Sequence, residues 1–299
     1  MNPPFQRESV WQEVNRQCTG TTKSRLRWKE DRFRAFSLAL PPIPEQRRIV
    51  DLIGALDDAI TAAQTSLATC RSTWSLALSQ FDSDAPTAPL HDLFAHIIGG
   101  AWGDAPGASD TAVLALGPKS YAGRISVDAS AAAPRSLSAA RAAERVLRDG
   151  DIVLERSGGS PTQPVGRVIR MEGNSPSNIV PSDFQRLLRP APATADPAYV
   201  FWKMWLNYEL GAPLPFQKAT TSIRNLNIPA YLANVRIALP DRTEQMRFVQ
   251  LAESFADAAE KQAGLANRLT ELRADLLTAL LSGEHEIPES YDELMEVAS

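Results

Sequence analysis

One stretch of the sequence occurs twice, 199 residues apart. SLALPPIPEQRRIVDLIGALDDAI begins at Ser37, and RIALPDRTEQMRFVQLAESFADAA begins at Arg236. Further identical residues lie upstream of the two copies: Thr21, Thr22 and Arg25, and Thr220, Thr221 and Arg224. A repeat at one fixed offset predicts a duplicated unit, with most of its first copy missing from this sequence.

Each copy predicts an extended segment that stops at a proline and a long helix that follows. Pro41, Pro42 and Pro44 suit a helix start, because a missing N–H costs nothing there. Downstream, apolar residues recur at alternating steps of four and three, which is a heptad seam. The first copy has Ile49, Ile53, Leu56, Ile60, Ala63, Leu67, Cys70 and Trp74 at these steps. The second copy has Leu251, Phe255, Ala258, Gln262, Leu265, Leu269, Leu272, Leu276 and Ala279. Two helices of about 35 to 40 residues, each roughly 50 to 60 Å long, are therefore expected to pair with each other, with Trp74 in the seam.

Residues 82–240 lack the heptad pattern of the repeated segments. A proline-rich linker, DSDAPTAP, runs from Asp82 to Pro89 and leads into loop-rich sequence with short strand-like runs. The best strands are residues 151–156 and 166–170. PAYVFWKMWLNYEL, residues 197–210, predicts a helix packed on this domain. Trp202 and Trp205 within it suit a buried core better than a base-stacking platform.

The charge is unevenly distributed. The net charge is −4, but residues 241–299 carry 5 basic and 13 acidic side chains, whereas residues 91–240 carry 15 and 12. The acidity is therefore concentrated at the C-terminal end, where residues 284–299 form an acidic tail. Phosphate neutralisation needs lysine and arginine, and a denser basic patch runs from Arg16 to Arg34. It could hold a polyanion, and a solvated basic loop is the alternative.

Cysteine and histidine usage argues against a metal site or a disulfide framework. Cys18 and Cys70 lie far apart with no CxxC pair, and His91, His96 and His285 form no cluster. No run of about 18 uninterrupted apolar residues exists, and the N-terminus lacks the apolar core of a signal peptide. We therefore expect a cytoplasmic protein without a metal or a membrane partner.

The repeated segments resemble a known family. LPPIPEQRRI and LPDRTEQMRF are similar to the conserved regions of type I restriction-modification specificity subunits, where an L-P-x-x-x-E-Q motif opens a long spacer helix. LTELRADLLTALLSGEHEIP resembles the close of the second spacer. GDIVLERSGGSPTQPVGRVI, PSDFQRLLRP and ATTSIRNLN look like parts of a target recognition domain. The resemblance runs from Thr19 to Pro288.

The resemblance implies an α+β fold, with a loop-rich mixed α/β target recognition domain and an antiparallel two-helix coiled-coil spacer. Residues 82–240 would be the recognition domain, and residues 41–81 and 241–283 the spacer helices. Residues 1–40 are interpreted as the remnant of a first recognition domain, because GTTKSRLRWKEDRF looks like the tail of one.

The family also implies a function without catalysis. The chain would read half of a split site in double-stranded DNA and dock adenine methyltransferase and endonuclease subunits. It would bind no cofactor itself, and S-adenosylmethionine would belong to the methyltransferase. Since one recognition domain accompanies two spacer helices, a homodimer over inverted half-sites is one hypothesis, and a second, different specificity chain that supplies the missing recognition domain is the alternative.

Candidate DNA-binding residues follow from the chemistry of base reading. Specific recognition needs side chains that reach base edges, with basic and hydroxyl groups that fix the backbone. Two stretches supply them: Arg156, Ser157, Gln163 and Arg167, and Lys218, Thr220, Thr221, Ser222, Arg224 and Asn225. Arginine could pair with guanine, and glutamine or asparagine with adenine. For each residue taken singly, a surface or turn role is the alternative.

Two other functions stay open. The first is a coiled-coil scaffold without DNA reading. The second is a methyltransferase fragment, since NPPF at residues 2–5 spells the motif of adenine-N6 methyltransferases, although no Gly-rich cofactor loop follows. Gly158-Gly159 predicts a tight turn rather than a phosphate cradle. Glu45 and Glu244 suit the dipole at the first turn of each helix better than a catalytic pair.

Overall fold

A computed structural model describes residues 8–19, 26–37, 40–81, 84–121, 125–160, 163–173, 178–219, 223–283 and 285–293. The chain divides into two compact units, Met1–Arg71 together with Asp257–Ser299, and Ser72–Ala256. Two long helices run through both units, and the main sheets lie in the second. The predicted α+β fold class is confirmed.

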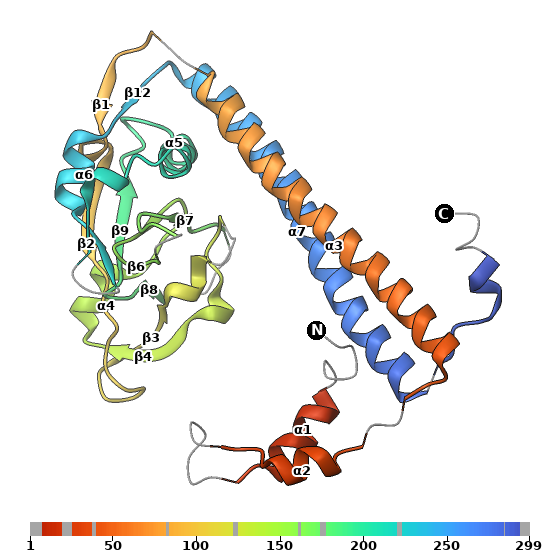
Figure 1. The fold of residues 1–299 in the computed structure, drawn as a ribbon. Coiled ribbons are helices and arrows are strands. Elements are labelled where there is room, and N and C mark those ends of the chain that lie inside the picture. Colours follow the sequence, from red (N-terminus) through yellow and green to blue (C-terminus); the bar gives the residue numbers. More distant parts are fainter. Residues whose placement is uncertain are drawn as a thin grey trace. The chain divides into compact units, whose positions relative to one another are not determined.

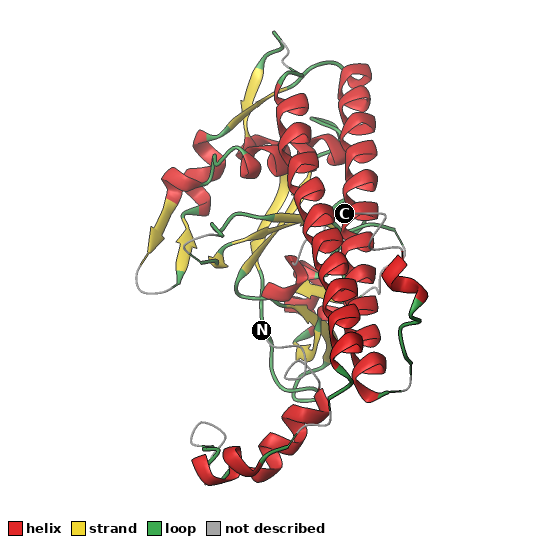
Figure 2. Ribbon diagram, turned by 45° about the vertical axis from the view of Figure 1, so that its right-hand side comes forward, coloured by secondary structure: helices red, strands yellow, loops and turns green. Residues whose placement is uncertain are grey.

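The two long helices are confirmed as well. α3 (Ile43–Ser79) has 37 residues and α7 (Arg242–Ser282) has 41, and they lie side by side in Figures 1 and 2. In the first unit, Ile53 near the start of α3 belongs to the same apolar cluster as Leu277 near the end of α7. In the second unit, Trp74 near the end of α3 stacks on Phe255 near the start of α7. The pair is therefore antiparallel, as expected.

One ion pair joins the two helices in the first unit. Arg273 of α7 donates hydrogen bonds of 2.5 and 3.0 Å to the carboxylate oxygens of Asp57 on α3. These hydrogen bonds, and the positive charge behind them, lower the pKa of Asp57. About half of the Asp57 side chain is exposed. Because exposed ion pairs contribute little free energy, the pair orients the two helices but adds little to the stability of the first unit.

The predicted apolar stripe is right for α3 and partly wrong for α7. No residue of the α3 stripe is exposed, and Ile49, Ile53, Ala63 and Trp74 are buried. On α7, three stripe positions are exposed: Ala258, Leu265 and Leu272. Positions one residue further along are buried instead: Ala252, Ala256, Ala259, Ala266, Leu277 and Leu280. The buried face of α7 thus lies one residue further along the helix than predicted, and Leu265 and Leu272 lie outside it.

This register predicts opposite outcomes for two leucines five residues apart. Leu277→Ala is expected to destabilise the chain by about 2 to 3 kcal/mol, because it removes a buried side chain close to the end of a helix. Leu272→Ala is expected to change the free energy of unfolding by less than about 0.5 kcal/mol, because its side chain is already 51% exposed. Urea unfolding of both variants measures the difference. A larger loss of unfolding free energy for Leu272→Ala than for Leu277→Ala would contradict the register of the structure and favour the one predicted from the leucines.

The E-Q motif forms the same helix start in both copies. Gln46 Nε2 donates to the carbonyl oxygen of Pro41 at 2.7 Å, and Gln245 Nε2 donates to that of Pro240 at 2.8 Å. The glutamine thus ties the first turn of each helix to the proline that ends the preceding segment. Glu45 has a further role, since its Oε1 accepts the backbone N–H of Ile287 at 2.9 Å and so fixes the C-terminal segment.

The described part of the second unit contains four small sheets, all between residues 84 and 240, and we call this region the sheet domain. The main sheet is antiparallel, in the order β2 (Phe94–Gly99), β9 (Gln185–Pro190), β5 (Ile152–Glu155) and β7 (Val168–Arg170). A second sheet has the order β4 (Ala133–Leu137), β3 (Thr111–Leu116) and β8 (Ile179–Pro181), with β3 and β8 parallel. The others are β1 (Thr87–Pro89) with β12 (Arg236–Ala238), and β10 (Gln217–Ala219), β11 (Arg224–Leu226) and β6 (Ser157–Gly158).

Short helices complete the sheet domain. The α-helices are α4 (Ala139–Arg145), α5 (Pro197–Glu209) and α6 (Ile228–Asn234), and the 3-10 helices are η3 (Leu90–Leu93), η4 (Pro118–Tyr121), η5 (Ala129–Ala131) and η6 (Leu214–Phe216). The predicted helix at 197–210 and the predicted strands at 151–156 and 166–170 are confirmed. The carboxylate of Asp196 caps α5 by accepting the backbone N–H of Ala198 and Tyr199. Trp202 and Trp205 are buried, as predicted.

The described N-terminal residues have the element order of the end of the sheet domain. α1 (Glu8–Gln17) is followed by a bridge between Thr19 and Arg27 and then by α2 (Glu30–Ala35). At the repeat offset of 199 residues, α2 falls within α6 and the bridge falls on the β10–β11 pair. The duplication seen in the sequence therefore extends to local structure upstream of the helices.

Candidate nucleic-acid interface

The sheet β10–β11–β6 brings the two predicted groups of DNA-binding residues together. Arg224 of β11 pairs with Gly158 of β6, and Asn225 pairs with Ser157. On the other side of β11, Asn225 pairs with Lys218 of β10. Two stretches more than 50 residues apart in the sequence thus form one surface, which periodicity alone did not predict.

The predicted residues differ in how far they reach solvent. Arg156, Gln163 and Lys218 are exposed, and Arg224 and Asn225 are half-buried. Ser157 is buried and donates its hydroxyl to Oδ1 of Asn225. Thr220, Thr221 and Ser222 lie outside the described residues, as do Thr21, Thr22 and Arg25 of the first copy and the NPPF motif. These described candidates offer three cationic side chains and two amides on neighbouring strands and turns.

Arg167 has a structural position. Its Nε and Nη2 donate to the two carboxylate oxygens of Glu155 at 2.9 and 2.7 Å, and the Glu155 side chain is 2% exposed. Its guanidinium also lies over the ring of Tyr121, 4.9 Å from the centroid. Burial, reinforced by the negative charge of Glu155, raises the pKa of the Tyr121 hydroxyl. Because its donors are engaged inside the domain, Arg167 favours the alternative, structural role.

A β-bulge lies beside this surface, where the pairing of the inner strands β5 and β9 of the main sheet ends. The backbone N–H groups of Arg156 and Ser157 both donate to the carbonyl oxygen of Phe184, at 2.8 and 3.1 Å. Bulges of this kind re-aim side chains next to functional sites. Here the bulge lies where β5 ends and the chain passes into β6 of the candidate surface.

The turn predicted at Gly158-Gly159 is confirmed. Gly159 has a φ of +67°, and a Cβ at this position would lie 2.6 Å from the carbonyl oxygen of Gln163. Only glycine tolerates both conditions. The turn returns the chain through the Ser160–Gln163 bridge, so that Gln163 stands close to β6.

Two residues near the bulge were missed by sequence reasoning. Phe184 is 42% exposed beside Arg156, and Arg186 of β9 pairs with Leu154 of β5, two residues before Arg156. Burial, and then the positive charge of Arg156, lower the pKa of Arg186. PSDFQRLLRP contains both residues, but only the strand pairing places them next to Arg156.

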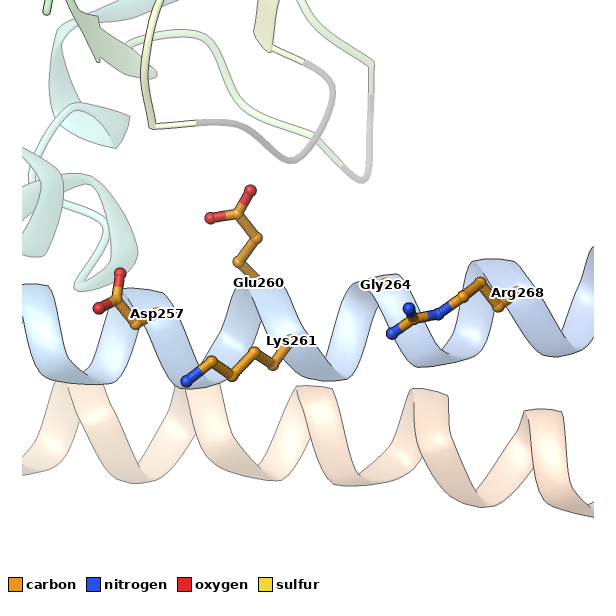
Figure 3. A pocket seen from close by; sticks show the side chains of 5 residues that line it. All are labelled: Asp257, Glu260, Lys261, Gly264 and Arg268. Carbon is orange, nitrogen blue, oxygen red and sulfur yellow. The ribbon is translucent and has the colours of Figure 1, made fainter.

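A hollow on α7 does not fit a polyanion. It has a volume of about 400 Å³ and lies at Gly264, flanked by Asp257, Glu260, Lys261 and Arg268 (Figure 3). Two acidic and two basic side chains give it no net charge to attract phosphates. Within the described residues there is also no cluster of three metal-ligating side chains, and no helix is long and apolar enough to span a membrane.

Comparisons with known proteins agree with this architecture. No protein-family model matches the chain, and no curated protein matches it. Among solved structures, the Type-I restriction-modification system S subunit from M. genitalium matches 91% of this chain over 70% of its own length, with a TM-score of 0.51 and 12% identity. This chain has the fold of a type I specificity subunit. The resemblance predicted from the repeated E-Q segments is therefore confirmed as a likeness of fold.

Two further solved structures match this chain. A chain from the structure describing complex assembly and conformational transition of the type I R-M system matches 82% of this chain, with a TM-score of 0.50 and 22% identity. This chain spans 60% of the length of that one. The HsdS subunit from Thermoanaerobacter tengcongensis matches 95% of this chain over 69% of its own, with a TM-score of 0.43 and 19% identity.

Proposed function

We propose that this chain is a DNA-specificity subunit of a type I restriction-modification complex. The sheet domain reads one half of a split site, and the helix pair docks methyltransferase and endonuclease subunits. The chain catalyses nothing itself, and S-adenosylmethionine belongs to the methyltransferase. The observation that carries the proposal is the β10–β11–β6 surface, which gathers Lys218, Arg224 and Asn225 beside Arg156 in a chain with the specificity-subunit fold.

An apolar stripe left outside the helix pair supports subunit docking. Ala258, Leu265 and Leu272 recur on α7 at steps of seven and are exposed. We call these residues the outer stripe. A heptad stripe on a helix is a seam for another helix. A methyltransferase helix or a second copy of this chain fits it, and a two-fold pair of chains would favour two inverted copies of one half-site.

Arg224 is the residue on which base reading is tested. Arg224→Ala is expected to weaken binding to the cognate half-site by about 1 to 3 kcal/mol, the worth of one good side-chain contact to a base. The melting temperature should stay unchanged, because Arg224 has no ion pair among the described residues. The loss of affinity is measured by fluorescence anisotropy at two salt concentrations, with a duplex that contains the sequence methylated in vivo.

The matched control is Arg148→Ala. Arg148 is an exposed arginine that precedes β5. Arg148→Ala therefore removes one positive charge from the same domain, but at the end of β5 that is far from β6. Equal affinities of wild type and Arg224→Ala would remove Arg224 from the interface. A chain whose only binding is insensitive to salt would instead be the coiled-coil scaffold, because counterion release makes DNA affinity fall steeply with salt.

A further inference from the structure

Arg156 and Arg186 lie at the same end of the two inner strands of the main sheet, β5 and β9, and we call this place the corner. Arg186 of β9 lies opposite Leu154 of β5, and Arg156 follows two residues later, at the bulge. Gly99 of β2 lies on the other side of Arg186 in the sheet. A Cβ at Gly99 would be 2.7 Å from Nη1 of Arg186, so the guanidinium lies across the space that a glycine leaves open.

The two guanidinium groups differ from those of three half-buried arginines of the sheet domain. Arg167, Arg170 and Arg189 each pair with a carboxylate, at 2.7, 2.5 and 2.7 Å. Among the residues that the structure describes, neither Arg156 nor Arg186 has such a partner. Arg186 is half-buried, and the pKa of Arg186 is lowered by burial and by the charge of Arg156. Two like charges thus share one corner without a counter-charge from the domain.

Only an anion offsets this arrangement. A guanine edge accepts hydrogen bonds from one arginine but is neutral, so it leaves the repulsion between two guanidinium groups in place. A phosphate oxygen pair matches the guanidinium fork and carries the missing charge. The corner also adjoins β6, so a phosphate held there would fix the register of the β10–β11–β6 surface on the duplex.

We propose that Arg156 and Arg186 form a clamp for one phosphodiester of the DNA backbone, next to the base-reading surface. The inference rests on the proposed function and adds Arg186, which the candidate residues did not include, together with the ligand that the two arginines would hold. The clamp contributes affinity that does not depend on base sequence. Arg186 approaches from β9 and Arg156 from the bulge, so both strands must be in place for the phosphate to be held.

The clamp predicts a change in salt dependence. For the full chain and a short duplex of mixed sequence, Arg186→Gln is expected to reduce the slope of log affinity against log salt by about 0.9, which is one phosphate contact. The same contact corresponds to about an eightfold loss of affinity at about 0.1 M salt. Arg156→Gln is expected to give the same loss, and since Arg156 is exposed, this variant does not depend on refolding around a half-buried site. Arg186→Lys keeps the charge and should restore most of the slope.

The outcomes separate the clamp from the proposed function. Arg148→Gln, the matched control, should leave the slope within error of wild type. If the affinity of wild type falls steeply with salt and both glutamine variants show the same slope, the clamp proposal is wrong, but the proposed function in DNA recognition is unaffected. If either variant alters the preference between sequences at an unchanged slope, that arginine reads bases and the clamp is overturned. If wild type itself binds no duplex, the proposed function fails first.

Discussion

Replacing Trp74 by alanine is expected to lower the free energy of unfolding by about 3 to 5 kcal/mol, the usual cost of truncating a buried tryptophan. Trp74 is 2% exposed and stacks on Trp205 with 4.1 Å between ring centroids. Trp202 and Phe255 lie 5.4 and 6.1 Å from it. Trp74 thus joins α3 to α7, as predicted from the seam, and also to α5, which the sequence did not reveal.

Leu76→Ala is the control for this prediction. Leu76 lies on the same helix but is 62% exposed, so its truncation should cost less than about 0.5 kcal/mol. For a unit of this size, a loss of 3 to 5 kcal/mol corresponds to a melting temperature lower by roughly 6 to 20 °C. Equal melting temperatures for the two variants would mean that Trp74 is not packed between the helices and α5.

Arg167→Ala is the second change with a large expected effect. It leaves the carboxylate of Glu155 buried without its guanidinium partner, and breaking a buried pair in this way typically costs about 3 to 5 kcal/mol. The reverse change, Glu155→Ala, leaves the Arg167 guanidinium, 16% exposed, without a partner and should cost a similar amount. Urea unfolding curves with unchanged slopes would measure both losses.

The control pair is Arg34 with Glu30, whose side chains are both 76% exposed. Arg34→Ala is expected to change stability by less than about 1 kcal/mol, because exposed ion pairs contribute little. Arg167 was also a candidate for DNA contact. A stable Arg167→Ala variant that had lost DNA affinity would support that role and would contradict the structural one argued from Glu155.

The two long helices could be predicted because the segment that begins each of them occurs twice in the sequence. The offset of 199 residues placed both helix starts, and Gln46 and Gln245 show why the motif recurs, since each closes the same first turn. The α3 stripe was right because three of its four buried positions, Ile49, Ile53 and Trp74, are large and apolar. The α7 stripe was misplaced because leucine outweighs alanine in a hydrophobic pattern, whereas the buried positions of α7 include small residues such as Ala259 and Ala266.

The candidate site was predictable only in its parts. Both stretches around Ser157 and Arg224 carried suitable side chains, but their meeting depends on the pairing of β6 with β11, which no local pattern encodes. Arg186 was missed for the same reason, since its neighbour Arg156 lies 30 residues earlier in the chain. Arg167 could have been suspected, because Glu155 lies at the end of the strand that pairs with its own segment.

The central claim, that this chain selects a DNA sequence, is tested most directly by binding and sequencing. The full chain, alone and with its methyltransferase partner, would be incubated with a library of randomised duplexes, and the retained duplexes would be sequenced. The account predicts enrichment of one short motif, present twice in inverted orientation if two chains assemble, and loss of that enrichment with Arg224→Ala. Retention of duplexes without any enriched motif, or no retention at low salt, would contradict it.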